Sequence, residues 1–436
     1  METATKIEIF WRKSIKPSSP TPPHRRTLNL SLLAQTYPSI HGSMIFFYIS
    51  STTNFDSLLK SLSETIVHFY PFAGRLKNDN SIHCNDEGVY VVQAQIKCRL
   101  QIFLQKPDLK LLKHLLPTSD PEISKLPTEP ISLIQLNIFS CGGIAISVCV
   151  SKKIADSSSL FSFIKTWAAI NSGLHESVEP PKFLGAPLFP PADLPIMGLN
   201  NVPGEDDLGR VWATRRLVFD AQKLSHLKAQ NLIKKPTNFE LVSALVSKCA
   251  MVSAPTSQNK TPSLLYRELN LKDGSMSEPP LPENAVGNHV WLFPVMFEES
   301  HNKKDLFEVL IKMRKGLTEF CDDVANGFEG DDSFLLAREI LRDPIEASKM
   351  GVNIYCCTSL CELPLYEVDF GFGKPIWATS PMSSNNMFAF TETKWGEGIE
   401  VVVTLEERHM AAFERDEELL RFASFNPSAT SSYCRL

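Results

Sequence analysis

The clearest hydrophobic pattern in the chain lies near the middle of its N-terminal half. Residues 144–150 form a largely apolar run of strand length, and apolar positions recur at helical spacing over residues 157–168. A polar step, residues 151–156, separates the two and contains Lys152 and Asp156. We expect a buried strand, a tight junction and a helix, an arrangement that often carries functional side chains.

Similar patterns predict further elements in the first 150 residues of the chain. They are a helix at residues 55–68 and strands at residues 5–12, 43–49, 89–93 and 133–138. Pro71 ends this helix, and Gly74 permits a turn into the next strand.

A proline-rich stretch divides the chain into two series of elements. It favours an N-terminal domain at residues 1–180, a crossover loop at residues 181–210 and a C-terminal domain at residues 211–436. In the second half we expect strands at residues 211–219, 352–355, 387–391 and 399–405, and helices at residues 238–252, 305–320 and 406–422. The alternation predicts two α/β domains with mixed sheets and a ligand cleft between them.

Composition narrows the class of protein. The 436 residues are 43% hydrophobic and 21% charged with a net charge of -5, which is typical of a soluble globular protein and argues against nucleic-acid binding. We find no signal peptide or membrane span and expect a cytoplasmic protein. The last residues, Cys434-Arg435-Leu436, resemble a relaxed peroxisomal address, which is the alternative location. Cys356, Cys357 and Cys361 cluster without metal-site spacing, so no metal is expected.

Four motifs resemble the plant BAHD acyltransferase family in order and spacing. They are "YPFAGRL" (70–76), "SKKIAD" (151–156), "PPLPENAVGN" (279–288) and "DFGFGKP" (369–375). The resemblance implies two chloramphenicol-acetyltransferase-like domains joined by a crossover loop, with a channel between them. It also implies acyl transfer from coenzyme A thioesters to alcohols or amines in plant specialised metabolism, such as alkaloid or phenolic metabolism. We expect a monomer that binds a small plant metabolite.

The chain departs from the first family motif, HxxxD, at its histidine. The resemblance implies a histidine that acts as general base and an aspartate that shapes the loop. Asp156 is present, but the position four residues earlier is Lys152. The family's base is therefore missing, and Lys152 and Asp156 are the candidate catalytic residues.

The second motif, DFGWG, is nearly intact. Phe372 stands where the family has tryptophan, and Gly371 and Gly373 are predicted to be turn residues. The resemblance implies a structural pair between Asp369 and an arginine before "PPLP", a place that Lys272 occupies here. We expect an Asp369–Lys272 pair, weaker than one with the bidentate guanidinium.

Lys152 permits several chemical roles. A lysine with the usual pKa of about 10.4 is charged and cannot accept a proton, and losing a positioned base typically costs about 10²–10⁴-fold in rate. A neutral buried lysine could act as base or form an imine with a carbonyl substrate. A charged lysine could anchor a carboxylate or stabilise an enolate. The alternative is a solvated lysine on a surface turn.

Two other residues are substrate-pocket candidates. The resemblance places His41 beside the acceptor pocket, so it could replace the base, although a histidine next to a glycine is more often a turn residue. Ser151 adjoins Lys152. The serines at residues 157–159 follow Asp156 at a helix start, where capping or first-turn roles are typical.

Three functions remain open. The favoured one is a divergent BAHD-fold enzyme that performs an elimination, lyase or cyclisation step on an anionic or carbonyl-bearing metabolite. The second is a coenzyme A-dependent O- or N-acyltransferase that uses Lys152 or another base. The third is a catalytically inactive ligand-binding protein.

Overall fold

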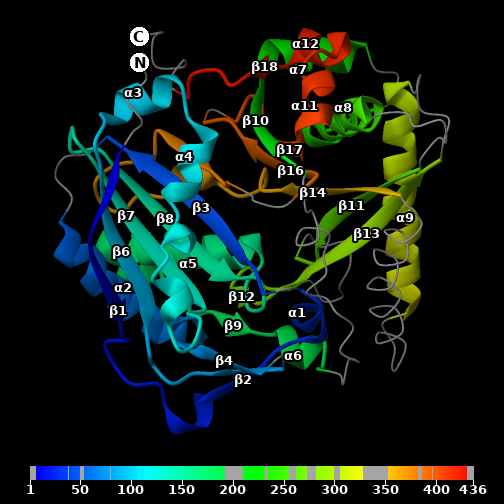
Figure 1. The fold of residues 1–436 in the computed structure, drawn as a ribbon. Coiled ribbons are helices and arrows are strands. Elements are labelled where there is room, and N and C mark those ends of the chain that lie inside the picture. Colours follow the sequence, from blue (N-terminus) through cyan, green and yellow to red (C-terminus); the bar gives the residue numbers. More distant parts are fainter. Residues whose placement is uncertain are drawn as a thin grey trace.

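Two mixed β-sheets, one for each half of the chain, form the framework of the protein (Figure 1). The computed structural model describes residues 6–37, 39–49, 54–78, 80–191, 210–230, 234–254, 262–272, 281–298, 305–327, 352–381, 385–394 and 396–429. The predicted fold class, two α/β domains with mixed sheets, is confirmed.

The N-terminal sheet has six strands in the order β1-β6-β7-β8-β3-β15. In that order they are Ile7–Ile15, Val89–Ile96, Ser132–Phe139, Ile144–Ser151, His41–Tyr48 and Trp377–Thr379. Strands β6 and β7 are parallel, whereas the other neighbours are antiparallel. The two faces of this sheet pack in separate apolar clusters, one with α2 (Phe55–His68) and α5 (Ser157–Asn171), the other with α3 (Leu100–Gln105) and α4 (Leu109–His114). The predicted strands and helices of this half are all formed.

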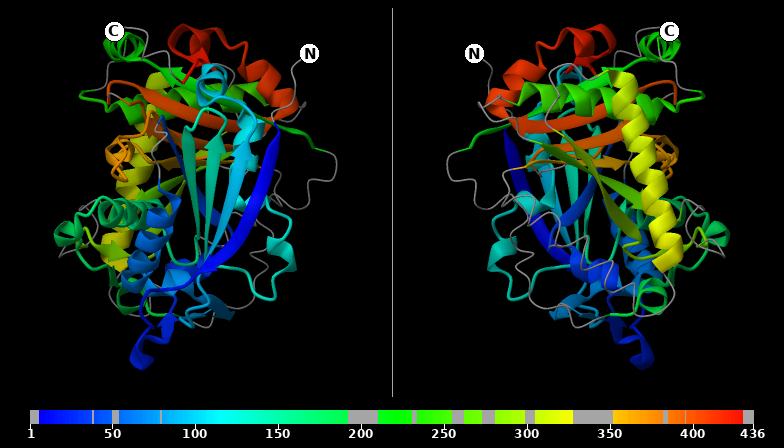
Figure 2. Two further views of the ribbon diagram at one scale, coloured as in Figure 1. Left: turned by 90° about the vertical axis from the view of Figure 1, so that its left-hand side faces the viewer. Right: turned by 90° about the vertical axis from the view of Figure 1, so that its right-hand side faces the viewer.

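The C-terminal sheet has seven strands in the order β13-β11-β14-β16-β17-β10-β18. In that order they are Val290–Phe297, Ser263–Asn270, Asn353–Ser359, Met387–Glu392, Ile399–Glu406, Trp212–Phe219 and Ser424–Phe425. Its helices are α7 (Ala221–Ala229), α8 (Asn238–Ser253), α9 (Leu306–Gly327), α11 (Glu407–Phe413) and α12 (Glu417–Phe422). Figure 2 shows the long helix α9 running along one side of this half. Strands β11 and β13 were not predicted.

Several smaller elements lie outside the two large sheets and their helices. A three-stranded sheet contains β2 (Thr27–Asn29), β5 (Ser81–His83) and β4 (Arg75–Asn78). Two short helices are α1 (Leu32–Thr36) and α6 (Gly185–Leu188), and η2 (Tyr70–Ala73) and η8 (Leu365–Glu367) are 3-10 turns.

Two strands tie the halves together. Strand β15 comes from the C-terminal half and pairs with β3, and β12 (Ala285–Val286) pairs with β9 (Lys182–Phe183). The Nε1 group of Trp377 on β15 donates to Glu400 on β17 at 3.3 Å, and Glu400 pairs with the buried Arg216 at 2.7 Å. The buried joint holds the two sheets in a fixed relation because breaking such a pair leaves an uncompensated charge.

The prediction of a single helix at residues 406–422 is wrong, because the structure has two helices there, α11 and α12. Helix α11 ends at Phe413, and the carboxylate of Asp416 accepts the N–H of Leu419 at 2.8 Å to start α12. A capping aspartate interrupts a continuous helix and starts a new one. The apolar spacing runs on across this break, and spacing alone therefore predicted one helix.

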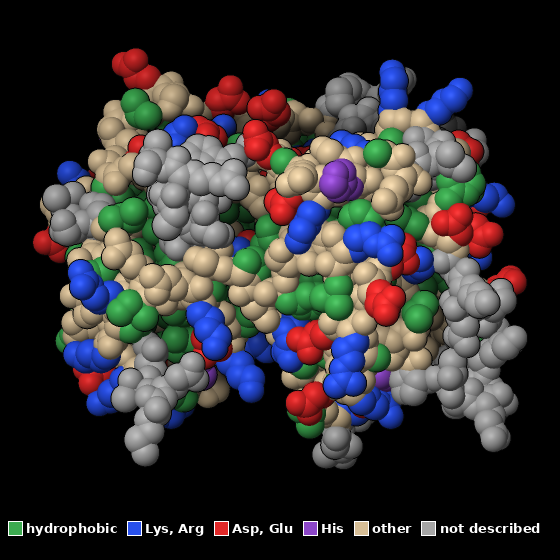
Figure 3. All heavy atoms as spheres, turned by 90° about the horizontal axis from the view of Figure 1, so that it is seen from above, with side chains coloured by type: hydrophobic (Ala, Val, Ile, Leu, Met, Phe, Trp, Pro, Cys, Tyr) green, Lys and Arg blue, Asp and Glu red, His purple; other side chains and the backbone are tan. Residues whose placement is uncertain are grey.

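Some predictions fall outside the described residues. They include residues 192–209 of the crossover loop and the terminal Cys434-Arg435-Leu436. Within the described ranges, no helix combines the length and apolar character needed to cross a bilayer. The face in Figure 3 carries acidic and basic side chains interspersed, consistent with the mixed charge of the sequence.

Candidate functional site

The predicted strand, junction and helix are formed by β8, residues 152–156 and α5. The backbone of Asp156 is extended, and its Oδ1 accepts the N–H of Ser159 at 2.7 Å and the hydroxyl of Ser158 at 2.9 Å. Asp156 is therefore the N-cap of α5, and the serines are first-turn residues as predicted. The cap fixes the junction that carries Lys152.

Lys152 is buried, with 5% of its surface exposed, so it is not a solvated lysine on a surface turn. Its N–H donates to the carbonyl of Ile40 at 2.8 Å, and its Nζ lies 3.5 Å from the Oγ of Ser157. Within the described part of the chain, no carboxylate forms an ion pair with this amine. A buried ammonium without a counter-ion is costly, which marks Lys152 as unusual.

A glycine makes the room that Lys152 occupies. A Cβ atom at Gly42 would lie 3.1 Å from the Cε and 3.7 Å from the Nζ of Lys152. The lysine stem therefore lies against the backbone of β3, and a side chain at position 42 would crowd it.

The C-terminal half contributes a clamp, residues Gly287–His289. The carbonyl of Gly287 accepts the N–H of Asp156 at 3.0 Å, and the side chain of Asn288 donates to the carbonyl of Lys152 at 2.8 Å. The N–H of His289 donates to Oδ2 of Asp156 at 3.0 Å. Both ends of the junction are thus held by the other half of the protein.

The imidazole ring of His289 lies next to Asp156. The ring is fully buried, and its Nδ1 lies 3.6 Å from Oδ2 of Asp156. Neither ring nitrogen has a hydrogen-bond partner among the described residues. Burial raises the pKa of Asp156, but His289, the charge of Lys272 and the amide of Ser159 outweigh it, so that this pKa lies well below its usual range. Asp156 is therefore an anion at neutral pH.

Tyr37 lies within electrostatic reach of the same carboxylate. Its hydroxyl is buried and has no partner in the described ranges. Burial, together with the charges of Glu268 and Asp156, raises the pKa of Tyr37 well above its usual value. The hydroxyl is therefore a neutral group at physiological pH.

The predicted Asp369–Lys272 pair is wrong. Asp369 Oδ1 accepts the N–H groups of Gly371 and Gly373 at 2.7 and 2.9 Å, and the Asp369 carbonyl accepts the hydroxyl of Ser172 beyond the C-terminal end of α5. Lys272 donates to the carbonyl of Ala285 at 2.5 Å and acts electrostatically on Asp156 at the other end of α5. Helix α5, 15 residues and about 22 Å long, lies between the two places where these groups act.

The structural role predicted for the second motif fits its contacts. Phe372 packs edge-on against Tyr48 and stacks on Phe370, and the side chain of Asn171 donates to the carbonyl of Phe370 at 2.6 Å. Gly371 and Gly373 have φ of 91° and 101°, conformations that glycine adopts at little cost. The motif docks a loop of the C-terminal half on α5 and β3.

The two pocket candidates have structural contacts. His41 opposes Ser151 in the β3–β8 register, and its Nε2 lies 3.2 Å from the carbonyl of Pro130. Successive strand residues point to opposite faces, so His41 points away from the face where Gly42 contacts Lys152. The Oγ of Ser151 accepts the N–H of Lys153 at 3.3 Å. These contacts give neither side chain a position beside the amine of Lys152.

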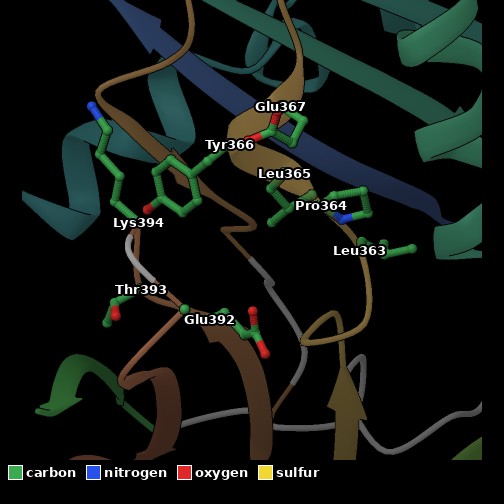
Figure 4. A pocket seen from close by; sticks show the side chains of 9 residues that line it. Leu363, Pro364, Leu365, Tyr366, Glu367, Glu392, Thr393 and Lys394 are labelled. Atoms are coloured by element: carbon green, nitrogen blue, oxygen red, sulfur yellow. The ribbon is translucent and has the colours of Figure 1, made fainter. Parts of the chain in front are cut away.

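Two cavities border the described residues. One of about 170 Å³ lies between η8 and the β16–β17 turn, with Tyr366, Glu392 and Lys394 in its wall (Figure 4). The other, about 20 Å³, lies beside Lys153 and Asn288 and is the size of about one water molecule. The larger cavity does not include Lys152 in its wall.

Sequence reasoning missed His289, Tyr37 and Gly42. Asn288 ends the quoted motif "PPLPENAVGN", and His289 follows it directly, so the motif itself marked the place. Periodicity gave no signal, because contact between residues 156 and 289 depends on the docking of the two halves.

Comparisons with known proteins agree with this architecture. The chain belongs to the Transferase family, whose model matches residues 5–420, and which corresponds to the BAHD acyltransferases that the motifs resemble. Akuammiline synthase 1 of Alstonia scholaris is 34% identical over 94% of this chain and 96% of that protein. Limonoid 21-O-acetyltransferase of Melia azedarach is 33% identical over 97% of this chain and 99% of that protein.

Solved structures show the same fold. The crystal structure of vinorine synthase has a TM-score of 0.80 and 28% identity, covering 97% of this chain and 100% of that one. The Fusarium graminearum protein TRI101, complexed with coenzyme A and T-2 mycotoxin, has a TM-score of 0.67 and 15% identity, covering 92% and 99% of the two chains. The latter likeness concerns the fold alone.

Proposed function

We propose that the chain is a divergent BAHD-fold enzyme of plant specialised metabolism whose reaction is not acyl transfer. It performs an elimination, lyase or cyclisation step on an anionic or carbonyl-bearing metabolite. The observation that supports this proposal is Lys152, which replaces the family's base and whose buried amine has no carboxylate partner in the described residues. A lysine kept only for stability would be expected to have such a partner.

In this proposal Lys152 acts as a positioned positive charge. Its ammonium binds a carboxylate of the substrate, or the carbonyl oxygen on which negative charge develops when the adjacent carbon loses its proton. An enolate oxygen is stabilised strongly by a preorganised cation in a site with little water. Removing a single preorganised donor of this kind typically costs about 10²–10³-fold in kcat.

A second candidate is coenzyme A-dependent acyl transfer, which the names of several relatives favour. Relatives include limonoid acetyltransferases and an N-malonyltransferase of Strychnos nux-vomica. In this case a coenzyme A thioester is a substrate, and a neutral Lys152 or another base takes the proton of the acceptor.

One experiment separates the two candidates. The purified chain is incubated with a panel of anionic and carbonyl-bearing plant metabolites, with and without acetyl-coenzyme A, and products are measured by mass spectrometry. We expect turnover without coenzyme A, reduced at least about 10²-fold in Lys152→Ala. Turnover that requires the thioester supports acyl transfer.

Two variants complete the test. Lys152→His restores the family's base, and its acyl transfer and its native turnover are measured separately. Lys374→Ala removes an exposed lysine of the second motif and is the matched control. Undiminished native turnover in both Lys152→Ala and Lys152→His would exclude a role for this lysine. Folding is checked by thermal unfolding, where Lys152→Met should be no less stable because no carboxylate loses its partner.

A further inference from the structure

One face of the C-terminal sheet is only partly covered by other side chains. Successive strand residues point to opposite faces, and one face packs with α8 and α9 in the large core cluster of this half. The opposite face carries a small separate apolar cluster, several of whose side chains are half-buried. We call this second face the open face. It is formed by Leu264, Tyr266 and Glu268 of β11, Leu292 of β13, and Ile354 and Cys356 of β14.

Glu268 places a carboxylate on this apolar face. The side chain is half-buried, and its Oε2 accepts the hydroxyl of Thr358 on β14. Among the residues that the structure describes, no lysine, arginine or histidine forms an ion pair with it. A carboxylate partly removed from water is costly without a counter-ion, and a bound cation would supply one. The open face is therefore complementary to a ligand with an apolar body and one positive charge.

Tyr37 shows that the open face is turned toward the N-terminal half. This residue is the C-cap of α1, and its buried hydroxyl has no hydrogen-bond partner within the described ranges. The charges of Glu268 and Asp156 both act on this hydroxyl. It therefore lies near the open face and also near the junction that contains Lys152. A neutral hydroxyl in this place can donate to an oxygen atom of a ligand.

Strand β13 connects the open face with the clamp at Lys152. Leu292 is the partner of Glu268 in the β11–β13 register. Asn288 of the clamp, whose side chain donates to the carbonyl of Lys152, lies four residues before Leu292. Four residues of extended chain span at most about 14 Å. The backbone that holds Lys152 and the backbone opposite Glu268 are thus separated by no more than the length of a small metabolite.

We propose that Glu268 is a substrate-binding residue, whose carboxylate pairs with the ammonium of a basic amine while the apolar open face contacts the body of the substrate. The substrate then has two polar ends, an amine at Glu268 and a carbonyl or carboxylate group at Lys152. The inference rests on the proposed function, because it adds a second group to the substrate of the same site. Alkyl amines are protonated at neutral pH, as lysine is, so the pair forms under physiological conditions.

The first test measures binding of a probe amine to the full-length protein. Phenethylamine and its uncharged counterpart, phenethyl alcohol, are titrated by calorimetry at pH 7, and we expect the amine to bind at least about tenfold more tightly. Glu268→Gln keeps the shape and an acceptor for Thr358 but loses the charge, so this preference should disappear. Glu319→Gln removes an exposed carboxylate on α9 and is the matched control, which should retain it. A preference that persists in Glu268→Gln, or a wild-type protein that does not bind the amine, would refute the proposal.

The second test reverses the charge and looks for a gain of binding, which a misfolded protein cannot produce. Glu268→Lys is made in the Lys152→Met background, so that the native lysine does not contribute. Compared with Lys152→Met alone, it should lose phenethylamine and bind hydrocinnamate, a carboxylate of similar size, at least about tenfold more tightly. An unchanged affinity for hydrocinnamate contradicts direct contact between position 268 and the charge of the ligand.

The results separate failure of this inference from failure of the proposed function. Phenethylamine binding that depends on Glu268, together with metabolite turnover that does not depend on Lys152, contradicts only the proposed function. Turnover that depends on Lys152, together with phenethylamine binding that is the same in wild type and Glu268→Gln, contradicts only the amine site.

Discussion

The two ends of helix α5 carry the two family motifs, and their polar groups are satisfied in different ways. At the C-terminal end, Asp369 accepts two N–H groups of its own loop, and Phe372 packs among aromatic rings. At the N-terminal end, the amine of Lys152 and the ring nitrogens of His289 lack partners of the expected kind in the described residues. Both ends take part in the docking of the two halves, but in the described part of the chain only the N-terminal end keeps buried polar atoms without such partners, and the function proposed above assigns one of them, the amine of Lys152, to the substrate.

Asp156 provides the largest expected effect on stability. Asp156→Ala removes the cap of α5 and leaves the surrounding donors without an acceptor, so the free energy of unfolding should fall by about 3–5 kcal/mol. Chemical denaturation at pH 7 measures it. Asp156→Asn keeps an acceptor for Ser159 and should lose less. Equal losses in the two variants would contradict the capping role.

The same carboxylate predicts a dependence of stability on pH. The pKa of Asp156 is lower in the folded protein than the usual value of about 3.9 in the unfolded chain. Its contribution is therefore fully present above about pH 4 and is lost as the pH falls toward the folded pKa. Unfolding measured from pH 3 to 7 should show a shallower acid decline in Asp156→Asn than in the wild type.

Phe372 tests the opposite end of the helix. Phe372→Ala removes ring contacts with Tyr48 and Phe370 and should lower the free energy of unfolding by about 2 kcal/mol, less than a fully buried phenylalanine because Phe372 is half-buried. Phe372→Trp, which restores the family's residue, is the matched control and should be tolerated. A loss of turnover larger than the loss of folded protein would show that this end also takes part in the reaction.

His41 should make a smaller contribution to the pH dependence of stability, and the direction of this contribution is defined. Burial lowers the pKa of His41 in the folded protein, although Glu129 and the carbonyl of Pro130 oppose this, so the unfolded chain takes up the proton more readily. Stability should therefore fall as the pH drops through about 6.5. His41→Gln should weaken this dependence and change turnover little. Loss of turnover with stability intact would instead make His41 a reacting group.

Lys374 should have the smallest effect. It pairs with Glu367 on the surface, where more than half of each side chain is exposed. Exposed pairs contribute about 0–1 kcal/mol, so Lys374→Ala should be nearly neutral in stability and activity. A change as large as that of Lys152→Ala would show that charge at the second motif also matters.

Local pattern predicted some elements well and others poorly. Residues 55–68 form α2 with the predicted bounds, because the apolar spacing, the cap by Asn54 and the stop at Pro71 agree. Strands β11 and β13 were missed, and β15 has only three residues, which are defined by pairing with β3. Such strands depend on partners distant in sequence more than on their own periodicity.

The sequence by itself determined the family motifs, the two mixed-sheet domains and the helix that starts after Asp156, with Lys152 four residues earlier. That Asp156 itself caps this helix came from the structure. Only the tertiary structure decided that Lys152 is buried, that Lys272 acts on Asp156 rather than Asp369, and that His289 joins the site. The physical reason is that capping and periodicity arise among near neighbours in the chain, whereas burial and the field at a carboxylate depend on which distant segments dock against it.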